Sequence, residues 1–297
     1  MTWIISWPLP EPETVTPTMT TPAPVDEIAK RFRKPLIMGI VNCTPDSFHE
    51  GSRANTFELA VARALKLVEE GADILDFGGQ STRPGADDVS LEIERSRVIP
   101  VIKAVAGKVP VKISIDTTKA AIAAEAIDSG AAILNDISAL RDDKGMLKVA
   151  LRAERVILMH MSGSSPKTMQ ANPTYKDCFS EVSSFLRERL NSFIAAGGRA
   201  DRVWVDPGIG FGKTLEHNLT LIRRAGELSS IAPVVLGVSR KSMFGKILPD
   251  NGPEDRLAGS LAVASWAALS GISILRVHDV LETRRVIETL GRISEAS

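Results

Sequence analysis

Residues 203–214, VWVDPGIGFGKT, run an apolar strand directly into an acid and a glycine-rich turn. A polar turn at the end of a strand is typical of a ligand site in an α/β protein. The stretch also imitates two nucleotide-binding motifs, and counting excludes both. A P-loop requires glycine where Pro207 stands, and a dinucleotide-binding turn requires glycine where Lys213 stands. The stretch is therefore interpreted from the rest of the chain.

Short runs rich in β-branched residues occur eight times, and each is followed by a segment with helical periodicity. The predicted strands are residues 35–41, 73–77, 111–115, 132–134, 156–159, 203–205, 234–238 and 273–277. A helix is expected over residues 56–70, with Phe57, Ala60, Ala64 and Leu65 on its apolar face. Eight strand-helix units in about 260 residues predict a closed (β/α)8 TIM barrel. A doubly wound open sheet is the alternative.

Polar residues stand directly after every predicted strand. They occupy residues 42–46, 78–85, 116–119, 135–136, 160, 206–208, 239–242 and 278–279, the last just after Arg276. In a parallel barrel these segments converge on the rim at the carboxyl ends of the strands, which builds the active site. A single acid such as Asp136 or Asp279 could simply cap the next helix, and His160 is interpreted as a packed imidazole. Eight polar strand ends together predict a catalytic rim.

The motifs at these strand ends resemble those of the dihydropteroate synthase family. They are MGIVN at 38–42, TPDSF at 44–48, GGQSTRPG at 78–85, IDT at 115–117, NDI at 135–137, DPGIGFGK at 206–213, SRKS at 239–242 and RVHD at 276–279. Their order and spacing agree over roughly residues 36–290. The resemblance implies that p-aminobenzoate is joined to 6-hydroxymethyl-7,8-dihydropterin diphosphate, with release of pyrophosphate, in folate biosynthesis. It also implies sensitivity to sulfonamides.

Two rival functions share much of this pattern. A catalytically silent pterin-binding paralogue would keep the pterin-binding residues and alter the loops. A cobalamin-linked methyltetrahydrofolate transferase would share the barrel but would not need the STRP loop, the SRKS motif or a diphosphate pocket. A purely structural barrel leaves the polar rim unexplained.

The aminopyrimidinone edge of a pterin has donors and acceptors, so its site needs a carboxylate, an amide and a cation. Asp206, Asn135 and Lys241 supply those three groups. The resemblance assigns them to pterin contact, together with Asp116 and, through packing, Met159.

A leaving diphosphate needs positive charge and a hard metal ion. Mg²⁺ can bind through one protein oxygen when phosphate oxygens and waters complete its shell, and Asn42 matches the metal-contacting position of the family. Arg276 and His278 are two residues apart, so both face the same side of the last strand and can bind phosphate. The resemblance adds Thr82. The resemblance implies that the diphosphate leaves before the amine attacks, so the pterin methylene becomes positively charged. A buried anion stabilises such a charge, and Asp116 is the predicted group. Lys241 is also predicted to be catalytic.

The p-aminobenzoate site is expected in the loops. Its predicted residues are Phe48, Thr82, Arg83, Pro84, Phe211 and Ser242. The chain departs from the family here: residues 49–52 read HEGS where Ser-Asp-Gly-Gly is usual, and Gln80 replaces a frequent Glu. Loop ordering and the sulfonamide response are the properties that these departures affect.

The 297 residues carry zero formal net charge and are 44% hydrophobic, which fits a large core and disfavours nucleic-acid binding. The two cysteines favour a reducing compartment, and no apolar run is long enough to cross a membrane, so a cytoplasmic enzyme is expected.

Residues 1–24 are rich in proline and threonine and are expected to form an extended, poorly ordered leader, either a natural extension or a linker from a larger folate-pathway fusion. Residues 25–297 are expected to form one pterin-binding barrel, with a helix over 25–32 at its base.

The resemblance further implies a homodimer that packs through its last helices. Residues 256–269, RLAGSLAVASWAAL, are apolar with many small side chains, which permit close helix approach.

Overall fold

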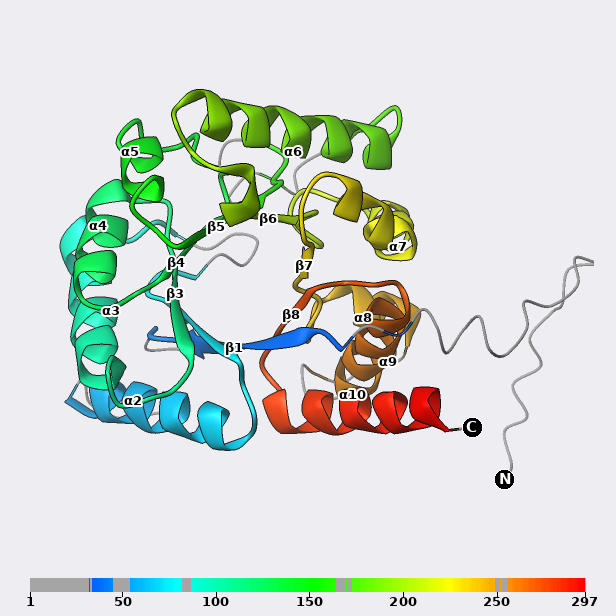
Figure 1. Ribbon diagram of the computed structural model, residues 1–297, viewed down its shortest axis with the longest axis horizontal. Coiled ribbons are helices and arrows are strands. Elements are labelled where there is room, and N and C mark those ends of the chain that lie inside the picture. The colour runs from blue at the N-terminus through cyan, green and yellow to red at the C-terminus, as the bar shows by residue number, and fades with distance from the viewer. Residues whose placement is uncertain are drawn as a thin grey trace, which may run out of the picture.

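Eight parallel strands stand side by side inside a ring of helices in the computed structural model of the chain (Figure 1). It describes residues 32, 34–44, 54–81, 87–163, 169, 173–248, 252 and 256–296, and only the backbone of residues 54–56. The strands are β1 (Leu36–Asn42), β2 (Ile74–Gly78), β3 (Lys112–Asp116), β4 (Ile133–Asp136), β5 (Arg155–Met159), β6 (Val203–Asp206), β7 (Val235–Leu236) and β8 (Ile274–Val277). All eight coincide with predicted strands.

The strand order β6-β5-β4-β3-β2-β1-β8-β7 leaves only β6 and β7 to be joined. A single parallel bridge between Val205 and Val234 joins them, and the Val205 N–H donates to the carbonyl of Pro233 at 3.0 Å. The ring is thereby closed, which confirms the (β/α)8 barrel and excludes the open sheet. β7 is shorter than the predicted strand 234–238.

Helices connect the strands and cover their outer faces. They are α2 (Ala54–Glu69), α3 (Leu91–Val105), α4 (Ala120–Asp128), α5 (Met146–Ala150), α6 (Cys178–Ala195), α7 (Leu215–Arg224), α8 (Met243–Ile247), α9 (Leu257–Leu269) and α10 (Val280–Glu295), with 3-10 turns η2 (Ala200–Arg202) and η3 (Ala225–Ser230). On α2 the fully buried side chains are Ala60, Ala64 and Leu67, at the spacing of one helical face. Phe57 and Leu65 of the same helix are 40% and 39% exposed, so the buried face is narrower than predicted.

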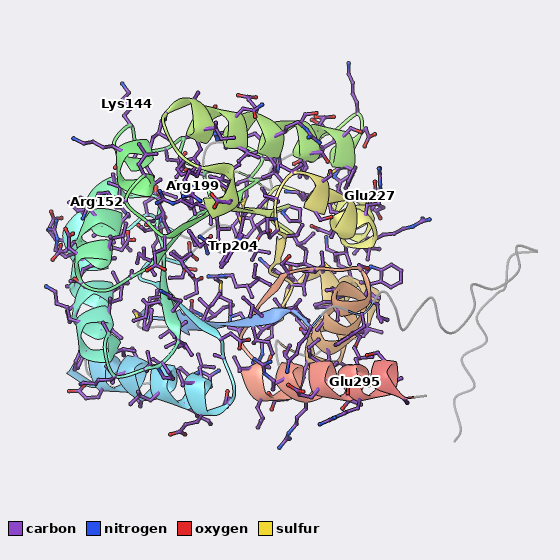
Figure 2. All side chains as sticks on the ribbon, in the orientation of Figure 1. Lys144, Arg152, Arg199, Trp204, Glu227 and Glu295 are labelled. Atoms are coloured by element: carbon purple, nitrogen blue, oxygen red, sulfur yellow. The ribbon has the colours of Figure 1, made fainter. Side chains whose placement is uncertain are left out.

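An apolar floor fills the inside of the barrel. One residue from each of six strands builds it: Met38, Ile74, Ile133, Ile157, Val235 and Ile274. Trp204 of β6 packs against this layer and is labelled inside the ring of helices in Figure 2. Side chains alternate between the two faces of a strand, so the residue two places after each floor residue also faces the inside, closer to the carboxyl end.

The predicted leader, residues 1–24, and the predicted helix over 25–32 lie outside the described residues, apart from Phe32. Among the helices that the structure does describe, none is long and apolar enough to cross a membrane.

Candidate active site

The candidate site side chains stand directly above the apolar floor. Two residues after a floor residue come Asp76 on β2, Asn135 on β4, Met159 on β5 and Arg276 on β8. Asp206 follows Trp204 in the same way. The strand register also pairs Gly78 of β2 with Asp116 of β3, and Asp116 with Asn135. The alternation of the strands therefore gathers the polar groups at one mouth of the barrel.

Arg276 is the centre of this polar layer. Its Nε donates to Asp76 Oδ2 and its Nη2 donates to Asp116 Oδ2, both at 2.6 Å. Asp76 Oδ2 also accepts from Asn135 Nδ2 at 3.2 Å. One partly buried guanidinium is thus held between two carboxylates, and one of those carboxylates also orients the amide of Asn135.

Burial controls the charges of this cluster. It raises the pKa of Asp116 to about 7, and Arg276 opposes that rise while Asp76 adds to it. Burial acts to lower the pKa of Arg276, but Asp76 and Asp116 together hold it above its ordinary value. The guanidinium therefore stays charged, and the charge on Asp116 depends on what lies beside it.

Asp206 stands at the end of β6, on the other side of β7 from Arg276. Its Oδ1 accepts the Gly208 N–H at 2.7 Å. Burial raises the pKa of Asp206, while this hydrogen bond, Lys241 and Arg276 act against the rise. Gly208 has φ +67°, and a Cβ there would lie 1.9 Å from the carbonyl oxygen of His160. Only glycine fits this turn, so the backbone donor that holds Asp206 depends on it.

Phe211 and Lys241 lie in the segments that follow β6 and β7. The Lys241 Nζ lies 4.5 Å from the centre of the Phe211 ring, within the range of a cation-π interaction. Phe211 packs in a small apolar cluster with Met159, which lies at the end of β5. Ser242 is the exposed residue that begins the short helix α8.

His278 stands just beyond the end of β8. Its backbone N–H donates to Ser239 Oγ at 3.2 Å, and its Nδ1 lies 3.1 Å from the same oxygen. Burial, followed by the charge of Arg276, lowers its pKa to about 3, so the imidazole is neutral at pH 7. The residue after Ser239, Arg240, has φ +55° and binds Asp279 through two hydrogen bonds of 2.9 and 2.5 Å. The loops after β7 and β8 are joined by these contacts.

The structure brings together Asn42, Asp116, Asn135, Met159, Asp206, Phe211, Lys241, Ser242, Arg276 and His278 at the carboxyl end of the barrel or in the loops there. Phe48, Thr82, Arg83 and Pro84 lie outside the described residues, as do residues 49–52. The interpretation of His160 as a packed imidazole is confirmed. It is buried, with its ring edge-on to Phe185 at 4.9 Å.

Reasoning from the sequence misses two residues of this region. In the sequence Asp76 is only one residue of the predicted strand 73–77. An acid between Leu75 and Phe77, at a position that faces the inside of the barrel, nevertheless indicates a buried polar site. Lys213 serves there only to exclude nucleotide motifs, yet it is 4% exposed. A charged residue inside an otherwise buried segment needs a partner, and that rule would have identified both.

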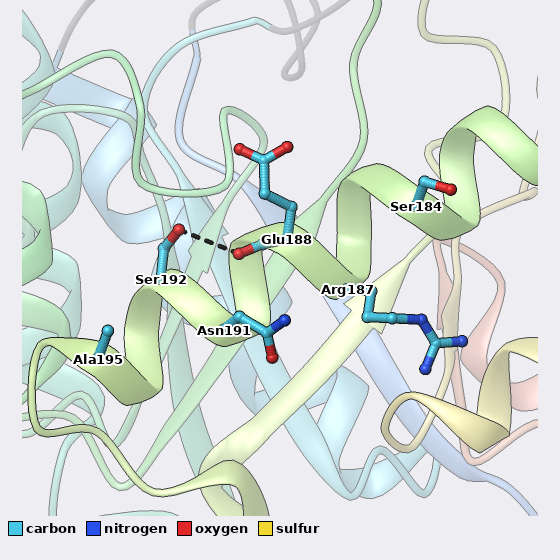
Figure 3. A pocket seen from close by; sticks show the side chains of 6 residues that line it. All are labelled: Ser184, Arg187, Glu188, Asn191, Ser192 and Ala195. Carbon is cyan, nitrogen blue, oxygen red and sulfur yellow. Dashed lines mark hydrogen bonds between the residues drawn. The ribbon is translucent and has the colours of Figure 1, made fainter.

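A separate shallow hollow lies on the exposed side of α6 (Figure 3). It is lined by Ser184, Arg187, Glu188, Asn191, Ser192 and Ala195. All six residues belong to one helix, and the Ser192 hydroxyl donates to the carbonyl of Glu188 at 3.0 Å. None of the predicted site residues lies in it, so the chemistry is assigned to the mouth of the barrel.

A closed barrel whose mouth carries acids, an amide, a guanidinium and a lysine matches a known class of protein. Residues 38–278 match the family described as pterin binding enzyme. The chain is 46% identical over 258 residues to the dihydropteroate synthase of Escherichia coli (strain K12), with 86% of this chain and 91% of that protein covered. It is 47% identical over 255 residues to the dihydropteroate synthase of Neisseria meningitidis serogroup C, with 84% and 89% covered. The chain belongs to the dihydropteroate synthase family.

Solved structures agree with this assignment. The dihydropteroate synthase of Xanthomonas albilineans with 4-aminobenzoic acid has a TM-score of 0.83 and 41% identity, and the match covers 89% of this chain and 94% of that one. The Yersinia pestis enzyme in a sulfonamide drug complex has the same TM-score and identity, with 89% and 95% covered.

Proposed function

We propose that the chain condenses p-aminobenzoate with 6-hydroxymethyl-7,8-dihydropterin diphosphate to give 7,8-dihydropteroate and pyrophosphate. The observation that carries this proposal is the hydrogen-bonded cluster of Arg276 with Asp76, Asp116 and Asn135, which sits in the same barrel mouth as Asp206 and Lys241. Relatives with this fold are solved with 4-aminobenzoic acid and with 7,8-dihydropteroate.

The pterin is proposed to lie above the floor, between β3, β4 and β6. Asp206 accepts hydrogen bonds from its N–H groups, the Asn135 amide both donates and accepts, and Lys241 donates to its carbonyl oxygen. Met159 packs against the ring. The bond from Gly208 fixes one oxygen of Asp206, which leaves the other oxygen to receive the pterin.

The diphosphate is proposed to bind Arg276 and His278, with Thr82 as a further contact. A guanidinium has five N–H donors, and the carboxylates of Asp76 and Asp116 engage the Nε and Nη2 groups. Donors therefore remain for phosphate oxygens. His278 is neutral, so it contributes a hydrogen bond from a ring N–H, and Arg276 contributes the charge.

Asn42 is the residue proposed to hold Mg²⁺. Within the described residues, no group of three or more His, Cys, Asp or Glu side chains could hold a metal ion. The partly exposed amide of Asn42 at the end of β1 fits an ion that takes one protein oxygen and completes its shell with phosphate oxygens and waters. When bound, the ion would offset the negative charge of the leaving pyrophosphate.

The reaction breaks the C–O bond between the pterin methylene and the diphosphate. A C–N bond to the p-aminobenzoate nitrogen forms, the pyrophosphate leaves with the electron pair, and the nitrogen releases a proton. Asp116 stabilises the positive charge that develops on the methylene. The amine is already neutral at pH 7, so the protein chiefly positions it. Its ring and carboxylate are proposed to contact Phe48, Thr82, Arg83, Pro84, Phe211 and Ser242.

The proposal predicts that pyrophosphate release from the pterin diphosphate requires both p-aminobenzoate and Mg²⁺. We expect dihydropteroate to form in equal amount, a sulfonamide to compete with p-aminobenzoate, and EDTA to stop the reaction until Mg²⁺ is restored. Pterin binding by calorimetry without any release would contradict the proposal and indicate a silent pterin-binding paralogue.

The chain is further proposed to be a cytoplasmic homodimer that packs through its last helices. Trp266 of α9 is 49% exposed, and Leu219, Ile247 and Leu248 of the neighbouring segments are 43 to 46% exposed. We expect light scattering at micromolar concentration to give twice the 32.0 kDa chain mass. Trp266→Glu should shift this mass toward the monomer, whereas Lys148→Met on α5 should not. A monomer mass for the unchanged protein would contradict the dimer.

A further inference from the structure

Lys213 is a buried lysine that the reaction described above does not use. It closes the glycine-rich turn after β6 and is only 4% exposed. Its Nζ donates to the carbonyl of Phe211 at 3.0 Å and lies 3.0 Å from His160 Nδ1 and 3.4 Å from the His160 carbonyl. These three acceptors match the three N–H bonds of an ammonium group.

The hydrogen-bond partners of Lys213 are neutral, which is unusual for a buried cation. Burial, followed by the charge of Lys213, lowers the pKa of His160 to about 2, so its imidazole is neutral and can accept. Burial also lowers the pKa of Lys213 to about 7. A methionine at position 213 would fill the same space without this desolvation cost. The presence of lysine therefore indicates that its hydrogen bonds have a role.

The turn that Lys213 holds is supported by side chains that donate to its carbonyl groups. Gly208, Gly210 and Gly212 have φ values of +67°, +82° and +66°. Such a backbone does not continue a helix or a sheet ladder, so its carbonyl groups need other donors. Lys213 supplies one for Phe211, and the Tyr175 hydroxyl supplies one for Gly212 at 2.9 Å.

Phe211 connects this support to the mouth of the barrel. Its carbonyl is bound by Lys213, while its ring lies 4.5 Å from the Lys241 Nζ. We propose that Lys213, bonded to His160, is a positioning residue that fixes Phe211 for binding the aromatic ring of p-aminobenzoate. This inference rests on the proposed function, because it assigns Phe211 to that substrate.

Lys213 could also act on the site through its charge, which lowers the pKa of Asp206. The Gly208 N–H, Lys241 and Arg276 each act on the Asp206 carboxylate more strongly than Lys213 does. Loss of Lys213 therefore leaves the main support of that carboxylate in place. The effect on p-aminobenzoate should exceed the effect on the pterin diphosphate.

The test is steady-state kinetics of Lys213→Met, which keeps most of the length of the side chain and removes its donors. We expect the KM for p-aminobenzoate to rise about tenfold, as for the loss of one buried hydrogen bond. The KM for the pterin diphosphate and kcat should each stay within about threefold. Lys148→Met, which removes an exposed lysine on α5, is the matched control and should change none of these values.

Tyr175→Phe provides a second variant that does not disturb a buried charge. It removes only the hydroxyl that binds the Gly212 carbonyl, so it should raise the KM for p-aminobenzoate about threefold and leave the other values unchanged. An equal rise in both KM values, a fall in kcat alone, or no change in either variant would overturn the inference. An inactive unmodified protein would instead refute the proposed function. In that case calorimetric titration with p-aminobenzoate decides whether Lys213→Met weakens its binding.

Discussion

Asp116→Asn is expected to lower kcat on the order of 100-fold or more. The KM for the pterin diphosphate should rise by less than about tenfold, because the proposed pterin contacts of Asn135, Asp206 and Lys241 remain. Asparagine keeps the shape of Asp116 and an acceptor for Arg276, whose Nη2 lies 2.6 Å from the present carboxylate. It removes the negative charge that is proposed to stabilise the developing cation. Steady-state kinetics with both substrates measures the two effects separately.

The pH profile gives this prediction a second readout. Burial raises the pKa of Asp116 to about 7, so its carboxylate becomes charged as the pH rises through that value. The activity of the unmodified protein should increase over the same range, and this increase should be absent in Asp116→Asn. Asp201→Asn, which alters an exposed acid in η2, is the control and should leave the profile unchanged. An unchanged kcat with a raised KM would limit Asp116 to binding.

The barrel could be predicted from the sequence because two regular patterns are clear in it: the alternation of side chains along each strand and the alternation of strands with helices. Floor residues such as Ile74 and Ile274 alternate with outward residues such as Leu75 and Leu275, and every strand is followed by a helix. The weakest strand was the least well predicted. β7 holds only two residues, and Val234 before it forms only an isolated bridge to Val205.

The site was predictable where polar residues end a strand. Asn135, Asp206 and Arg276 stand at or next to strand ends, and the structure brings all three to one mouth. Asp76 was hidden because it lies inside its strand, where the apolar neighbours dominate the pattern. Its importance depends on Arg276, 200 positions away, and no local pattern reports a contact at that separation.

Asp76→Leu is expected to reduce the free energy of unfolding by about 1 to 3 kcal/mol, because it leaves the Arg276 Nε and the Asn135 Nδ2 without their acceptor. Arg276 would keep only Asp116 as a hydrogen-bonded carboxylate, and Asn135 would lose the acceptor of its 3.2 Å bond. We expect kcat/KM to fall on the order of 100-fold as both side chains lose their orientation. Urea unfolding and steady-state kinetics measure the two losses. Asp76→Asn keeps an acceptor and removes only the charge, so its effects should be smaller.

Ser114 is the matched control because it is the register partner of Asp76 on β3 and is equally buried. Within the part of the chain that the structure describes, Ser114 Oγ and Asp76 Oδ1 have no hydrogen-bond partner. A buried hydroxyl without a partner costs stability, so Ser114→Ala should be neutral or stabilising and should leave kcat/KM unchanged. The two positions differ in one respect: Asp76 also has an oxygen that binds Arg276 and Asn135. An equal loss of stability and of kcat/KM in Ser114→Ala and Asp76→Leu would contradict this prediction. It would trace the effect of Asp76 to its unpartnered Oδ1, and the contact with Arg276 would not explain it.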